Sequence, residues 1–381
     1  MWLTKENLIY IYILSFFLPK YNVIDLSLFL QIALFLFIGL KYRIKVQLNI
    51  LLLALILFYL LLNISILAFT QTQIFAIAQV LKDLKLILAL CVSAVLIPTL
   101  SEGTNLIAHL QKSIVFLFTI NNSLMALQMF NENIRDFSLQ LFNFGNVGFT
   151  EFEDLAVHSY GLRVNGIFQS FDLASIWMSF FLMLIYSKLI KSNIILTLST
   201  FILLFFVSRT GVLLFFLFLF LDIIFNPNIK KIAFLFVFNL ILAYVVSVFW
   251  EYFFASSFAW LIDDIIHEFS SLKLTLSQAN VFGNYLPFYS NGSTSDVGYV
   301  HIILTYGLLF FIALMVFYFE IIFYKIKNRH IRLILFVIYI IGSFKTALVI
   351  GRGFWELFIF FAYVSTIEPV SKDENKKIMI S

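Results

Sequence analysis

Two arginines stand where polar segments meet long apolar runs. Arg163 lies in YGLRVNGIFQSFDLAS, just before an apolar run that begins near residue 171, and Arg209 lies in SRTG, between the apolar runs 194–207 and 211–225. An arginine beside hydrocarbon is costly unless it faces a partner or a wet cavity. The guanidinium presents its donors as a planar fork that matches phosphate oxygens. Both arginines are therefore candidates for holding a phosphate-bearing group.

The run after Arg209 is predicted to start a helix, with the backbone N–H groups around Thr210 and Gly211 free at the positive end of the helix dipole. Arg209 and this helix start together predict an anion site. The alternative is structural, because Arg163 and Arg209 can instead reach lipid headgroups. They can also pair with carboxylates of the preceding loop: Glu151, Glu153 or Asp154.

Further candidates lie nearer the C-terminus and at the start of the run near 171. Lys345 and Arg352 share a helical face if the run 333–350 continues that far, with Lys345 about 7 Å below the helix end. A buried lysine needs an anion, either a ligand or a neighbour such as Glu356. His301 fits an interhelical hydrogen bond better than catalysis. Asp172 fits a first-turn partner of the helix dipole better than a ligand.

The composition indicates which kind of structural element must position these residues. Of 381 residues, 62% are hydrophobic and 12% are charged, against roughly a quarter charged in soluble domains. Apolar runs close to the length of about 20 residues that crosses a bilayer recur along the chain. The sequence predicts an all-α polytopic membrane protein, one transmembrane domain over 1–381 with about twelve helices. The expected spans are 8–18, 23–40, 46–69, 84–100, 113–130, 171–187, 194–207, 211–225, 232–250, 299–324, 333–350 and 354–367.

Basic residues orient these spans. With twelve spans, the basic clusters KYRIK (41–45), Lys188 with Lys191, Lys230 with Lys231, and KIKNRHIR (325–332) all fall on one side. That side is predicted to be cytoplasmic, together with both termini. The two sizeable loops, about 131–170 and 251–298, then lie outside. The second contains an expected amphipathic helix at 253–272 that carries His267, a further possible site residue.

Several functional classes lose their support. The chain has no P-loop, no HExxH, no GxSxG and a single cysteine, Cys91, so ATP-driven transport, zinc hydrolysis and disulfide scaffolds are disfavoured. We expect no cofactor, no metal and no nucleic-acid partner.

Three segments carry a resemblance. RVNGIFQSFDLAS, SRTGVLLFFLFLF and SDVGYVHIILTYGLLFF, in this order and with a large external loop before the last, resemble the superfamily of O-antigen polymerases (Wzy-type) and O-antigen ligases. The resemblance spans about residues 80–365. It implies a GT-C-like, metal-independent glycosyltransferase, inverting or retaining, in the bacterial cytoplasmic (inner) membrane with its active site on the external face. The implied partners are undecaprenyl-diphosphate-linked oligosaccharides as donor and acceptor, with a chain-length regulator and a flippase.

One departure separates the two branches of that superfamily. Ligases carry a histidine eleven residues before the glycine of a Gly-Leu-(Leu/Ile) element, and here that position, counted back from Gly307, is Asp296. This favours a polymerase of O-antigen or capsule repeat units. It also means that His301 should not be assigned the catalytic role of the ligase histidine merely because it lies near that position. Asp296 becomes the candidate proton acceptor, although an aspartate at the start of a helix is also a common cap.

The expected roles follow from the transfer reaction. Arg163, Arg209 and Arg352, with Lys345, would hold the diphosphate leaving group. Two alternatives remain: an O-antigen ligase that uses lipid A core as acceptor, and a flippase or other transporter that does no chemistry. A transporter should show internal repeats and a polar path at the midplane, whereas the mid-span polar groups here are few, Asn121 and Asn122.

Overall fold

The computed structural model describes residues 4–16, 26–42, 61, 74–101, 105–131, 133–134, 137–138, 166–168, 171–248, 281, 298–344 and 354–366. Within these residues the fold is all-α, with twelve α-helices and no strand. Short π- and 3-10 segments extend two of the helices. The elements are α1 (Lys5–Ser15), α2 (Leu26–Lys41), α4 (Ile74–Ser101), α5 (Leu106–Phe130), α8 (Phe171–Tyr186), α9 (Ile194–Val207), α10 (Arg209–Phe225), α11 (Ile229–Val248), α14 (Gly298–Tyr306), α15 (Leu308–Phe319), η2 (Glu320–Lys325), α16 (Arg329–Leu335), η3 (Phe336–Ile341), η4 (Gly342–Phe344) and α17 (Phe354–Thr366).

Short polar residues between the apolar runs start several of these helices. Asn105 accepts a hydrogen bond from the N–H of Ala108, Asn193 from that of Ile195, and Asn328 from those of His330 and Ile331. Such caps satisfy N–H groups that have no partner inside the helix. They explain why the apolar sequence divides at these points.

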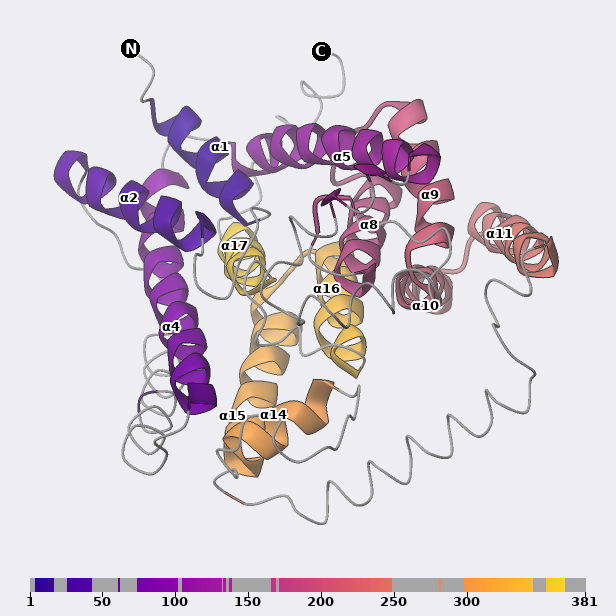
Figure 1. Cartoon of the computed structure of the whole chain (residues 1–381). Helices are drawn as coiled ribbons and strands as arrows, with labels where there is room; N and C mark the ends of the chain where they lie inside the picture. The colour runs from indigo at the N-terminus through magenta and orange to yellow at the C-terminus, as the bar shows by residue number, and fades with distance from the viewer. Residues whose placement is uncertain are drawn as a thin grey trace, which may run out of the picture.

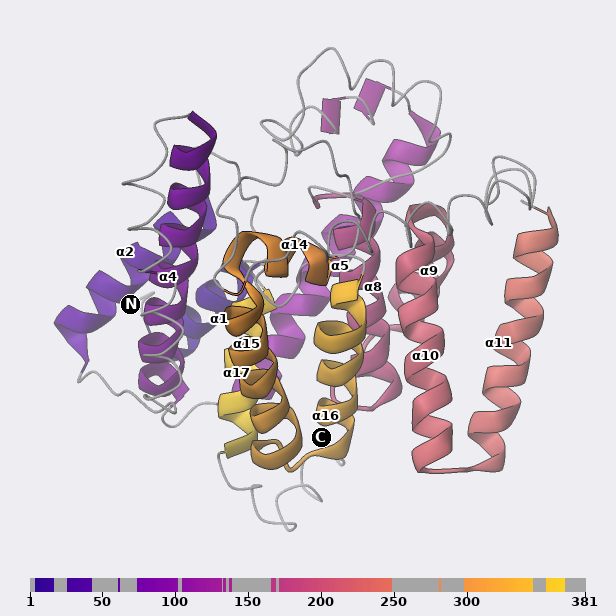
Figure 2. The ribbon, with the colours of Figure 1, turned by 90° about the horizontal axis from the view of Figure 1, so that it is seen from below.

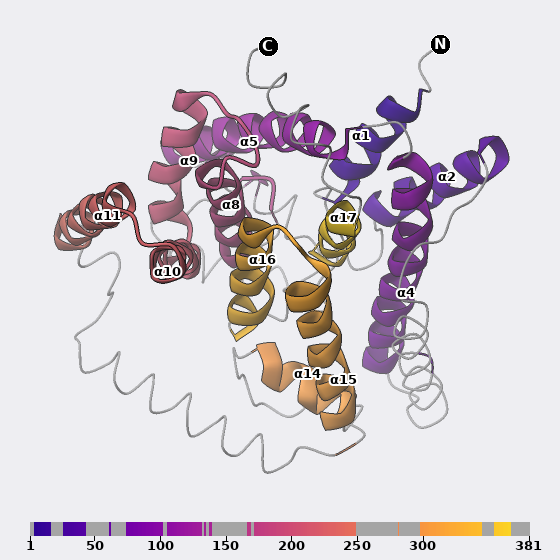
Figure 3. The ribbon, with the colours of Figure 1, turned by 180° about the vertical axis from the view of Figure 1, so that it is seen from behind.

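The helices form one bundle around α16, α17 and α8 (Figure 1). Helices α1, α2 and α4 pack on one side, and α9, α10 and α11 stand on the other, with α11 outermost. Helix α5 runs across the top of the bundle in the view from behind, above α8 (Figure 3), and touches both α1 and α9. Helices α10, α11 and α16 run roughly parallel to one another (Figure 2). Helices α8 and α10 begin at the same end of the bundle, which we call the site end.

Aromatic rings fill much of the core. The rings of Phe118 and Phe181 stack at 4.4 Å between α5 and α8, and the ring of Phe238 on α11 meets those of Phe201 on α9 and Phe215 on α10. Offset and edge-to-face ring pairs stabilise beyond the area they bury. Many phenylalanines of the described helices therefore serve packing within the bundle.

The predicted helices match the observed ones at most positions. Helices α4 and α5 begin earlier than their predicted spans. The predicted span 46–69, except residue 61, and the amphipathic helix at 253–272 lie outside the described residues. One prediction is wrong, because the span 299–324 is not a continuous helix. Gly307 adopts a φ of 91°, a conformation that favours glycine, and it separates α14 from α15, which lie at an angle (Figure 2).

The next helix also departs from regular geometry. It is α-helical to Leu335, π-helical over Phe336–Ile341 and 3-10 over Gly342–Phe344. A π-turn shifts the angular register of all later residues. Lys345 and Arg352 lie beyond the described part of this helix, so their predicted shared face stays a prediction.

Among the described residues, two helical stretches are long and apolar enough to cross a membrane by length and composition, Leu106–Phe130 and Leu308–Lys325. Six further apolar helical stretches are shorter: Leu26–Lys41, Leu84–Leu100, Asp172–Tyr186, Ile194–Val207, Thr210–Phe225 and Phe354–Val364.

Candidate functional site

The start of α10, where Arg209 is the first helical residue, is fixed to the start of α8 by Asp172. One oxygen of the Asp172 carboxylate accepts hydrogen bonds from the hydroxyls of Ser208, at 2.5 Å, and Thr210, at 3.1 Å. Ser208 also caps α10 by accepting from the N–H of Thr210 at 3.3 Å. The residues on both sides of Arg209 are thus bound to one carboxylate, which fixes the backbone from which Arg209 extends.

Two small residues allow α8 and α10 to approach closely just below this turn. A Cβ added to Gly211 would lie 2.5 Å from the carbonyl oxygen of Ser175, so only glycine fits there. The hydroxyl of Ser179 donates to the carbonyls of Ser175, at 2.8 Å, and Gly211, at 2.6 Å. The glycine of SRTG therefore serves helix packing.

The segment that follows Arg163 is held by α5. Gly166 donates its N–H to the side-chain oxygen of Gln128 at 3.0 Å, and its carbonyl accepts from the Gln128 amide nitrogen at 3.4 Å. The N–H of Ile167 donates to the side-chain oxygen of Asn121 at 3.1 Å. Gly166 has a φ of 60°, and a Cβ there would lie 2.0 Å from the Asn121 oxygen, so the loop conformation requires glycine.

An aromatic stack joins this loop to the start of α17. The ring of Trp177 on α8 stacks on Phe168 at 6.4 Å and on Phe354 at 4.2 Å. Phe168 is five residues after Arg163 and Phe354 is two residues after Arg352. The stack therefore anchors the flanks of two predicted cation positions on one helix.

The third segment of the resemblance reaches the same region through main-chain contacts. The hydroxyl of Tyr299, three residues after Asp296, donates to the carbonyl of Ile340, and the hydroxyl of Tyr339 donates to the carbonyl of Phe354. These bonds connect α14, η3 and α17. All three segments that the sequence singled out therefore have their anchor residues in one connected part of the bundle.

The structure describes the predicted site residues unevenly. Asp172 is described in full, and Arg209 and His301 are described as backbone positions in α10 and α14. The remaining predicted residues lie outside the described residues: Arg163, Asp296, Lys345, Arg352 and His267.

Two sequence-based expectations change. The N–H of Thr210, expected to be free for an anion, is bonded to Ser208, so the helix start offers less to a ligand than predicted. Asp172 lies in the first turn of α8 as expected, but its side-chain oxygen binds the Ser208 and Thr210 hydroxyls, a role that helix periodicity did not suggest.

Glu356, suggested as a partner for Lys345, contacts another helix. Its carboxylate is fully buried and accepts from the amide of Gln31 on α2 at 3.4 Å. The same Gln31 nitrogen donates to Ser15 at 3.0 Å. A buried carboxylate must be hydrogen-bonded or paired, and this one helps to join α17 to the α1–α2 pair.

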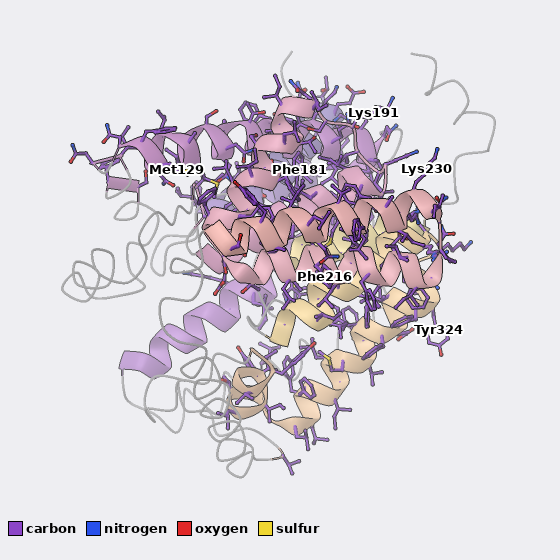
Figure 4. The ribbon with its side chains drawn as sticks, turned by 90° about the vertical axis from the view of Figure 1, so that its right-hand side faces the viewer. Met129, Phe181, Lys191, Phe216, Lys230 and Tyr324 are labelled. Atoms are coloured by element: carbon purple, nitrogen blue, oxygen red, sulfur yellow. The ribbon has the colours of Figure 1, made fainter. Side chains whose placement is uncertain are left out.

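The opposite end of the bundle is basic. Lys191 and Lys230 lie at that end, away from Met129 near the end of α5 (Figure 4). There Lys231 on α11 lies 2.6 Å from the fully buried carboxylate of Asp222 on α10. Burial lowers the pKa of the nearby His330, while the charge of Asp222 acts to raise it and those of Lys231 and Arg329 to lower it.

Sequence reasoning missed three residues at the site: Gln128, Ser208 and, in its specific role, Asn121. Ser208 had a signal, since Ser before an apolar run is a helix N-cap. Gln128 had only the weaker signal of an amide in an apolar helix. Its partner is a backbone loop 38 residues away, which periodicity does not reveal.

Among the described residues, no group of three or more His, Cys, Asp or Glu side chains could hold a metal ion. No protein-family model, curated protein or solved structure matches the chain.

Proposed function

We propose that the chain is a polytopic protein of the bacterial cytoplasmic membrane that polymerises lipid-linked repeat units of a surface polysaccharide. Its architecture is that of a GT-C-like helical glycosyltransferase whose site end faces outward. The observation that carries the proposal is the shared anchoring of the segments bearing Arg163, Arg209 and Arg352 around Trp177 and Asp172 at the site end.

The surface supports a membrane setting. Large apolar side chains are exposed on the outer helices, with Leu40 at 91%, Phe130 at 89% and Ile229 at 78%. On α11 the exposed Ile232, Phe236, Leu240 and Tyr244 recur every four residues and form one apolar face, which soluble proteins rarely leave uncovered. The basic end around Lys191 and Lys230 supports a cytoplasmic placement of that end.

In the proposed reaction, a hydroxyl of the acceptor sugar attacks the anomeric carbon of the donor glycan. The new C–O bond forms as the bond from that carbon to the diphosphate oxygen breaks, and the diphosphate leaves with the electron pair. Arginine forks at the site end stabilise the charge that develops on the leaving oxygens. Asp296 accepts the hydroxyl proton.

Deletion of the gene in the source bacterium tests the proposal. The expected result is surface glycan reduced to single capped repeat units, restored by the wild-type gene and not by Arg209→Ala at equal membrane abundance. Bare lipid A core would indicate a ligase, and repeat units retained inside the cell would indicate a flippase. Cysteine labelling should place Asn146 and Asn291 outside and Lys191 inside; labelling of Asn291 from the cytoplasm would contradict the mechanism.

A further inference from the structure

We propose that Asn121 and Gln128 of α5 are positioning residues for Arg163, an inference that rests on the proposed function. They bind the backbone of the loop that follows Arg163 and thereby set where that arginine enters the site. Neither residue is proposed to touch substrate.

Both amides are in positions where a polar group is costly. Asn121 and Gln128 are fully buried in a helix that is long and apolar enough to cross a membrane. A buried amide without hydrogen-bond partners is destabilising. The two residues are seven positions apart, and so lie on one face of α5, which is the face toward Gly166.

Their hydrogen bonds match the loop backbone. Gln128 bonds both the N–H and the carbonyl of Gly166, at 3.0 and 3.4 Å, as a paired peptide group would. The side-chain oxygen of Asn121 accepts a hydrogen bond from the next N–H, that of Ile167, at 3.1 Å. Three hydrogen bonds therefore fix two consecutive peptide groups of a segment that has a left-handed glycine and lies outside any helix.

The neighbouring Asn122 has a different role on the same helix. Its amide donates to the hydroxyls of Ser199 at 2.9 Å and Thr200 at 2.7 Å, both on α9. Asn122 is also buried, but it joins helix to helix. The chain thus offers two adjacent buried asparagines, of which only Asn121 binds the loop.

We call Asn121 and Gln128, together with the backbone of Gly166 and Ile167 that they bind, the clamp. The clamp is close to Arg163 along the chain. Gly166 is three residues from Arg163, so the chain between them spans at most about 10 Å. Fixing Gly166 and Ile167 limits the positions open to the arginine before substrate arrives. Such pre-organisation favours leaving-group stabilisation, because a cation already in place needs no reorganisation during the reaction.

Complementation of the deletion strain tests the function of the clamp. Asn121→Ala and Gln128→Met should each lower polymer yield at least about tenfold at matched membrane abundance. Tenfold corresponds to about 1.4 kcal/mol. Asn122→Ala, the matched control, should lower thermal stability while leaving polymer yield per molecule within about twofold. Each clamp variant should add less than about twofold to the loss caused by Arg163→Ala, because residues that act through one group are non-additive.

Hydrogen exchange in purified, lipid-embedded full-length protein reads the clamp independently of activity. Exchange at the amides of Gly166 and Ile167 should rise at least about tenfold in Asn121→Ala and Gln128→Met and stay unchanged in Asn122→Ala. Unchanged exchange in the clamp variants would overturn the inference. So would normal polymer from both clamp variants, or an equal loss from Asn122→Ala. Raised exchange together with normal polymer from Arg163→Ala would instead overturn the proposed role of Arg163.

Discussion

Asp172 offers the sharpest test of how the start of α10 is held. Its carboxylate receives the hydroxyls of Ser208 and Thr210 at 2.5 and 3.1 Å. Asp172→Ala removes the shared acceptor and leaves both hydroxyls without it. Asp172→Asn keeps a carbonyl oxygen in the same place but removes the charge.

The magnitude follows from the two bonds. A hydrogen bond to a charged group contributes about 1.5 to 3 kcal/mol, and a neutral one about 0.5 to 1.5 kcal/mol. Because Asp172, Ser208 and Thr210 are all partly exposed, values at the lower end apply. We expect Asp172→Ala to lose about 3 kcal/mol of local stability, and Asp172→Asn, which keeps two neutral bonds of about 0.5 kcal/mol each, to lose about 2 kcal/mol.

The assay combines thermal unfolding of the purified protein with polymer yield in the deletion strain. The expected order of both quantities is wild type, then Asp172→Asn, then Asp172→Ala. The double variant Ser208→Ala, Thr210→Val should lose more than Asp172→Ala, because Ser208→Ala also removes the cap of α10, and adding Asp172→Ala to it should change little. Ser247→Ala, which removes only a hydroxyl bonded within its own helix, is the control.

Two results would refute this reasoning. If Asp172→Ala kept wild-type unfolding temperature and yield, the carboxylate would not hold the turn. If Asp172→Asn lost activity as fully as Asp172→Ala while remaining stable, the charge of Asp172 would act directly in the reaction.

Three further predictions concern packing and charge. Gly211→Ala should destabilise by about 1 to 3 kcal/mol, since its Cβ would lie 2.5 Å from the carbonyl oxygen of Ser175; an unchanged or raised unfolding temperature would contradict the close α8–α10 contact. Lys231→Met should lower the free energy of unfolding by about 3 kcal/mol, because it leaves the buried Asp222 unpaired. Adding Asp222→Leu should restore most of that stability, and a double variant as unstable as Lys231→Met would disprove a simple ion pair. Burial lowers the folded-state pKa of His330 below its ordinary value, so the unfolded chain takes up that proton first as the pH falls. The stability is therefore full above about pH 6.5 and falls as pH drops through and below that value. His330→Gln should lose less unfolding temperature than the wild type between pH 7.5 and pH 5.5, and equal losses would rule out this histidine as the cause.

The sequence by itself determined the helical class and most helix positions. Apolar runs separated by Asn193, Ser208 and Asn328 mark helix starts through ordinary capping chemistry, and the structure places caps at those residues. Capping acts between residues two or three positions apart, so a linear reading can find it. The same reading also marked the three polar segments whose anchors meet in the bundle.

Breaks within helices were harder to predict. Gly307 lies in an apolar run, TYGLLFF, that continues the helical pattern on both sides, yet its φ of 91° separates α14 from α15. A glycine inside a helix and a glycine between two helices have the same local sequence signal. The contact of Tyr299 with the carbonyl of Ile340, far along the chain, accompanies the broken form.

Only the tertiary structure decided which polar residues act together. Gln128 meets Gly166 across 38 positions, and Asp172 meets Ser208 across 36. The sequence offered Asp172 as a dipole partner and the residues after Arg209 as a free helix start, and it singled out neither Gln128 nor Ser208. Their actual partners depend on how α5, α8 and α10 pack, because a buried hydrogen bond requires two groups within about 3 Å, and helix packing alone brings such distant positions that close.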